Sequence, residues 1–80
     1  MVIKKTTERR EFINRRGDKV GYCEFTIHEY ADKRYATISA DMPKYSEYTQ
    51  WDNVEECRAA FARDIEYYRG RVLAGAYDEF

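Results

Sequence analysis

Residues 52–75 restrict the fold most strongly, because they predict one helix with a single apolar side. Apolar side chains recur there at steps of three and four residues: Val54, Cys57, Phe61, Ile65, Tyr68 and Val72. Asp52 with Glu55, or Asn53 with Glu56, fits a capping box at the start. The helix is expected to end either at Gly70 or, if Gly70 is tolerated inside it, at the later stop Gly75. A single helix with one apolar stripe can cover only one face of a sheet.

The first half of the chain has a period of two residues, which predicts strands. We expect three strands, over residues 8–14, 19–30 and 35–40. In the second strand Cys23, Phe25 and Ile27 share one face, and the third strand directs its apolar residues to the same side. A type I turn ending in a left-handed glycine is expected at Asn14–Gly17.

A four-residue hairpin loop at residues 31–34 would fix how the second and third strands pair. It would place Tyr30 opposite Tyr35 in the neighbouring strand. The same register would give three further cross-strand pairs: His28 with Thr37, Ile27 with Ile38 and Glu24 with Asp41. Pro43 is expected to end the sheet, with residues 44–50 forming a polar connector to the helix.

The predicted fold class is therefore α+β, with residues 1–80 as a single small domain. It is a three-stranded antiparallel β-meander packed on one face by a single C-terminal amphipathic α-helix, in the order βββα. The second face of the sheet is left to solvent or to a partner.

The composition limits the class of protein. The net charge is -1, and no run of roughly 20 apolar residues could form a membrane span. Cys23 and Cys57 are expected to be buried free thiols, as in a chain of the reducing cytoplasm. Leu73 is the single leucine, and Leu, Ile, Val and Phe together supply 14 of 80 residues, so the eight tyrosines must supply much of the buried surface.

Catalytic chemistry is not expected. His28, the single histidine, falls mid-strand with no glycine-rich turn near it. Glu11, Glu24 and Asp41 could gather on the outer face, where like charges repel one another. A metal could relieve this repulsion, but a frayed strand end or a neighbouring arginine is the simpler expectation. The sequence predicts no catalytic residue, no metal site and no cofactor.

Tyrosines outside the helix are the most informative candidates for a binding surface, because Tyr, Trp and Arg dominate binding hot spots. Cross-strand stabilisation of a small sheet is the other explanation for them. The predicted partner-binding residues lie on the uncovered sheet face and in the connector: Tyr22, Thr26, His28, Tyr30, Tyr35, Tyr45 and Tyr48.

Basic residues in the first hairpin give an alternative site. Residues 1–20 hold seven Lys or Arg and three acidic residues, a local charge of +4, against -5 for the rest of the chain. Such a hairpin beside tyrosines could bind a phosphate backbone and stack bases. The nucleic-acid alternative rests on Arg9, Arg10, Arg15, Arg16 and Lys19.

Two resemblances follow from the expected layout. The order of three strands and a helix resembles the DNA-binding domains of a class of plant transcription factors and of integrase arm-binding modules. That resemblance implies reading DNA with the sheet face, which here carries Glu24 and Thr26. In size and layout the chain also resembles small phage-encoded inhibitors of bacterial defence, the anti-CRISPR proteins.

The second resemblance implies a non-enzymatic inhibitor, encoded by a phage or mobile element, that sterically blocks a host defence complex. Its partner would be a larger protein or ribonucleoprotein in the cytoplasm of a bacterial host. We expect no membrane association, and a monomer or weak homodimer.

Overall fold

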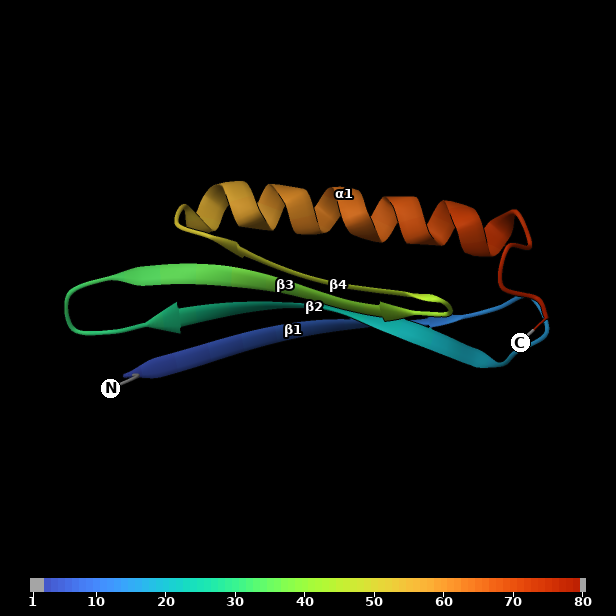
Figure 1. The fold of residues 1–80 in the computed structure, drawn as a ribbon, viewed down its shortest axis with the longest axis horizontal. Helices are drawn as coiled ribbons and strands as arrows, with labels where there is room; N and C mark the ends of the chain where they lie inside the picture. The colour runs from blue at the N-terminus through green and yellow to red at the C-terminus, as the bar shows by residue number, and fades with distance from the viewer. Residues whose placement is uncertain (1–2, 80) are drawn as a thin grey trace.

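The computed structural model describes residues 3–79 and contains four strands and one helix. The strands are β1 (Lys4–Ile13), β2 (Lys19–Glu29), β3 (Arg34–Met42) and β4 (Tyr45–Trp51), and the helix is α1 (Val54–Leu73). The strands form one antiparallel sheet in the order β1-β2-β3-β4. Helix α1 lies along one face of this sheet (Figure 1).

The predicted fold class is confirmed as α+β with an antiparallel sheet and one C-terminal helix, but the number of strands is wrong. Pro43 does end β3, yet the chain reverses through Lys44, whose φ is +61°, and returns as β4. The residues expected to form a connector pair with β3 from Met42–Tyr45 to Ala36–Trp51.

The strands also differ from their predicted bounds. Strand β1 begins at Lys4 rather than near residue 8, and the β2–β3 loop occupies residues 30–33. The pairing of β2 with β3 is offset by two residues from the expectation, so Phe25 faces Ile38 and His28 faces Tyr35. A shift of two residues keeps every side chain on its own face, so the predicted faces of both strands are correct.

Helix α1 agrees closely with its prediction. All six residues of the apolar stripe are buried. Of the two possible caps, Asn53 is the one used: its side-chain oxygen accepts a hydrogen bond from the Glu56 amide at 2.9 Å. Gly70 is tolerated within the helix, and Gly75 follows the helix end with a φ of +83°.

The core lies between α1 and the sheet face that carries Cys23, Phe25, Ile38 and their neighbours. Both cysteines are buried free thiols, as predicted, and burial raises the pKa of Cys23 to about 12 and of Cys57 to about 11. Both thiols therefore stay protonated near neutral pH.

The segment after α1 packs against the β1–β2 turn at the far end of the sheet (Figure 1). Tyr77 is 5% exposed, and its carbonyl accepts a hydrogen bond from the buried Asn14 amide at 2.8 Å. Asn14 also accepts from the amides of Arg16 and Asp18, which fixes the predicted turn with Gly17 at a φ of +90°. This segment closes one end of the core.

Candidate functional site

The face of the sheet opposite α1 is uncovered within residues 3–79 (Figure 1). The strand register places alternate residues of each strand on it. The aromatic and imidazole side chains of this open face are Tyr22, His28, Tyr35 and Tyr48, joined by Tyr30 from the β2–β3 loop.

Three rings form a continuous stack at one end of the open face. The rings of His28 and Tyr35 are 4.6 Å apart and nearly parallel, and those of Tyr35 and Tyr30 are 6.0 Å apart. His28 Nε2 also lies 3.0 Å from the hydroxyl of Thr37, which is 5% exposed. Cross-strand pairing of His28 with Tyr35 builds this stack, so it depends on the observed register.

The surroundings of His28 favour the neutral form of its ring. Partial burial, with a smaller contribution from the nearby Lys5, lowers the pKa of His28 below its ordinary value. Thr26, which lies next to His28 on the same face, shares a hydrogen bond of 3.2 Å with Thr7. This part of the open face is therefore polar, with Lys5 at its edge and the Lys33 ammonium 5.3 Å from the centre of the Tyr30 ring.

Arg9 organises the other end of the open face. Its guanidinium lies 3.8 Å from the centre of the Tyr22 ring and donates a hydrogen bond to Glu24 at 3.0 Å. The prediction that Glu24 would oppose Asp41 is wrong, because the observed register pairs Glu24 with Ser39. The neighbouring arginine expected to relieve the carboxylates is Arg9, from β1.

The structure brings six of the seven predicted partner-binding residues to one face. Tyr22, Thr26, His28, Tyr30 and Tyr35 lie there with Tyr48, which is 67% exposed. Tyr45 does not lie there, because its position in β4 has the opposite parity to that of Tyr48 and therefore faces α1.

The five basic residues of the nucleic-acid alternative are not brought to one surface. Arg9 is on the open face, whereas Arg10 lines a small hollow beside α1 with Glu8 and Arg58. Lys19 pairs with Glu11 at 2.6 Å, Arg15 pairs with Asp78 at 2.5 Å, and Arg16 donates to the Asp78 carbonyl at 3.1 Å. Arg10 donates a hydrogen bond to the Arg9 carbonyl at 3.3 Å, so all five are engaged by groups of the chain itself.

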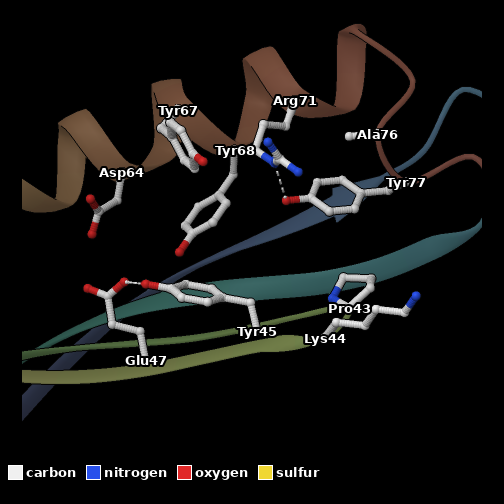
Figure 2. Close-up of a pocket in the computed structure, with 10 residues that line it drawn as sticks. All are labelled: Pro43, Lys44, Tyr45, Glu47, Asp64, Tyr67, Tyr68, Arg71, Ala76 and Tyr77. Atoms are coloured by element: carbon white, nitrogen blue, oxygen red, sulfur yellow. Dashed lines mark hydrogen bonds between the residues drawn. The ribbon is translucent and has the colours of Figure 1, made fainter.

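A second surface, which we call the tyrosine groove, lies between β4, α1 and the C-terminal segment (Figure 2). It is an open cavity of about 650 Å³. Its lining comes from three separate parts of the sequence: Pro43, Lys44, Tyr45, Glu47, Asp64, Tyr67, Tyr68, Arg71, Ala76 and Tyr77.

The two ends of the tyrosine groove differ in charge. At one end the Tyr45 hydroxyl donates to Glu47 at 2.5 Å, with Asp64 of α1 nearby (Figure 2). At the other end Arg71 Nε donates to the Tyr77 hydroxyl at 3.0 Å. Burial, reinforced by the Glu47 charge, raises the pKa of Asp64 above its ordinary value.

The tyrosine groove was not predicted from the sequence, because it exists only if residues 45–51 form a strand. The signal that could have found it was weak: Tyr45, Tyr48, Thr49 and Trp51 favour strands, and the segment contains neither proline nor glycine. Since β4 is partly exposed on both faces, its residues do not alternate between apolar and polar.

Replacing Asp64 by asparagine should stabilise the fold at neutral pH but not in acid. A carboxyl whose pKa is raised in the folded state binds its proton more tightly there, so folding stability falls as pH rises through that pKa. Asp64→Asn removes this loss. The unfolding free energy of the variant minus that of the unmodified chain should therefore be larger at about pH 7 than at about pH 3.

Urea unfolding at both pH values measures this difference. Glu66→Gln is the matched control, since Glu66 lies on the exposed side of α1 and pairs with Arg69 at 2.8 Å. An Asp64→Asn variant that is less stable than the unmodified chain at pH 7 would contradict the electrostatic account.

Within residues 3–79, no group of three or more His, Cys, Asp or Glu side chains is placed to hold a metal ion. The same part of the chain contains no helix with the length and apolar character that a membrane span requires. None of the protein-family models, curated proteins or solved structures compared with this chain matches it. The resemblances to DNA-binding domains and to anti-CRISPR proteins therefore stay predictions.

Proposed function

We propose that this chain is a non-enzymatic binding domain that docks a larger protein through its open sheet face. The observation that carries the proposal is the ring stack of His28, Tyr35 and Tyr30 on a face that no described element covers. Stacked rings are held in place before binding, so they lose little conformational freedom when a partner covers them. Tyrosine also offers a large apolar surface with a hydroxyl at its edge, which suits a protein interface.

The charges of the open face support a protein partner over a nucleic acid. Lys5 and Arg9 lie there with three carboxylates, Glu11, Glu24 and Asp41. Lys19 pairs with Glu11, and the Lys33 ammonium lies 5.3 Å from the centre of the Tyr30 ring. A surface that binds nucleic acid needs a net positive potential to displace the counterions of the phosphates. Within residues 3–79 the open face carries no cluster of unpaired cations, because Arg9 is engaged by Glu24 and the Tyr22 ring, and Lys19 is engaged by Glu11.

The mechanism in this proposal is steric. A partner seated on the open face would have that part of its own surface blocked, with no reaction at the interface. In its most concrete form the chain is an inhibitor encoded by a phage or mobile element, which acts in the cytoplasm of a bacterial host. Its target there would be a CRISPR-type defence complex, as the resemblance in size and layout implies.

Capture from a bacterial lysate with a tagged chain tests the proposal, with bound proteins identified and nucleic acid measured. Replacing Tyr30 and Tyr35 together by alanine should lower the captured protein at least about tenfold, because hot-spot tyrosines contribute about 2 kcal/mol or more each. The circular dichroism spectrum should stay that of a folded chain.

Tyr67→Ala is the control, because Tyr67 is 60% exposed and lines the tyrosine groove rather than the open face. It should capture the partner as well as the unmodified chain does. Full retention of the partner by the Tyr30 and Tyr35 variant would contradict the proposal. Capture that disappears after nuclease treatment would favour the nucleic-acid alternative instead.

A further inference from the structure

The two edges of the sheet are built very differently. Strand β1 carries six charged residues among its ten, and its pairing with β2 is interrupted by a register shift between Phe12 and Ile13. Strand β4 carries one charged residue, Glu47, among its seven, and it pairs with β3 without a shift. Charges and bulges are what sheet proteins use to prevent another strand from pairing with an edge.

The β4 edge therefore lacks the protection that the β1 edge has. Its outer backbone N–H and C=O groups have no strand beside them within residues 3–79. The segment is also rich in residues that favour strands, with Tyr48 67% exposed and Tyr45 50% exposed. An edge of this kind is suited to accept an additional strand.

From the sequence of β4 we infer that the added strand is β4 of a second copy of this chain. When two copies of residues 45–51 run antiparallel about a two-fold axis through Tyr48, all seven residues overlap. Tyr48 then faces Tyr48 of the second copy, and Tyr45 faces Trp51. Ser46 faces Gln50 and Glu47 faces Thr49, so aromatic side chains meet aromatic ones and polar side chains meet polar ones.

Other registers are worse for this segment. A pairing shifted by one residue would place side chains on the wrong face of the neighbouring sheet. An axis through Glu47 would overlap only residues 45–49 and would set the two Glu47 carboxylates directly opposite each other, which is unfavourable. The register through Tyr48 has the longest overlap and leaves Glu47 opposite an uncharged threonine.

The two-fold axis in this arrangement is perpendicular to the sheet, so both α1 helices lie on the same side. The open faces of the two copies then join into one continuous surface of eight strands. The inference does not depend on the proposed partner, because the contact forms between two copies of the purified chain.

Sedimentation equilibrium of the purified chain over a wide concentration range tests this dimer. The weight-average mass should rise toward twice that of the monomer. Tyr48→Lys and Tyr48→Glu should each weaken association at least about tenfold, since each sets like charges opposite one another at the axis. An equimolar mixture of the two variants should associate again, because lysine then faces glutamate.

Ile13→Lys is the matched control: it places the same charge at an exposed residue of β1, at the opposite edge of the sheet, and should leave the dimer intact. Restored association in the mixture is specific to an axis at Tyr48. An unmodified chain that stays monomeric at all concentrations would overturn the inference, as would a Tyr48→Lys variant that dimerises as well as the unmodified chain.

Discussion

Replacing Phe25 by alanine is expected to lower the free energy of unfolding by about 3–5 kcal/mol, the usual cost of removing a buried aromatic ring. Phe25 is 1% exposed and stacks on Phe61 of α1 with ring centroids 5.5 Å apart. The Arg58 guanidinium covers the ring from the solvent side at 4.8 Å. The variant therefore loses a ring stack between the sheet and α1.

The effect of this change should be large compared with total stability, because small domains are stable by only about 5–15 kcal/mol. Urea denaturation followed by circular dichroism is the measurement, and the midpoint should fall by about 1–3 M. Leu73→Ala is an informative control. Leu73 is the only leucine of the chain but is 67% exposed, so its replacement should change stability by less than about 0.5 kcal/mol. Equal midpoints for Phe25→Ala and the unmodified chain would refute this description of the core.

Alanine at Gly21 is expected to destabilise the fold by about 1–3 kcal/mol or more, even though alanine is the smallest possible addition. A Cβ atom at Gly21 would collide with the backbone carbonyl oxygen of Asp41, and it would lie 2.7 Å from the Met42 sulfur. The carbonyl cannot move away without disturbing the pairing of Tyr22 with Asp41. The glycine is needed because β2 and β3 approach closely there.

The same substitution at Gly70 should have the opposite sign. A Cβ atom at Gly70 would meet nothing within 4 Å, and the residue lies inside α1. Alanine should stabilise the helix there by about 0.8–1 kcal/mol, because glycine loses more backbone entropy on folding. Urea unfolding of the two variants measures the difference in their unfolding free energies. If Gly21→Ala were as stable as Gly70→Ala, β2 and β3 would not approach closely at Gly21.

The helix and the faces of the strands could be predicted because they depend on periodicity along the chain. The stripe from Val54 to Val72 repeats every three or four residues, and Cys23 with Phe25 repeats every two. Burial of one side follows directly from those periods. The left-handed Gly17 could be predicted for a similar reason, since it depends on the residues of one turn.

The register of β2 against β3 could not be predicted from the same alternation. Moving one strand by two residues keeps Phe25 and Ile38 on the core side, so alternation fixes only which face a residue takes. The observed register follows from a loop at residues 30–33 rather than 31–34. The stack of His28 on Tyr35 depends on this choice, so this part of the candidate site was beyond prediction.

By itself, the sequence determined that one amphipathic helix would cover one side of an antiparallel sheet, with both cysteines and Phe25 between them. Those features are periodic and local, so any compact fold of the chain must satisfy them. Only the tertiary structure decided that residues 45–51 form an edge strand, that Tyr45 and Tyr48 face opposite sides, and that Asp64 and Tyr77 line opposite ends of one groove. Those features depend on which distant segments approach one another, and packing energy between segments leaves no repeating pattern along the chain.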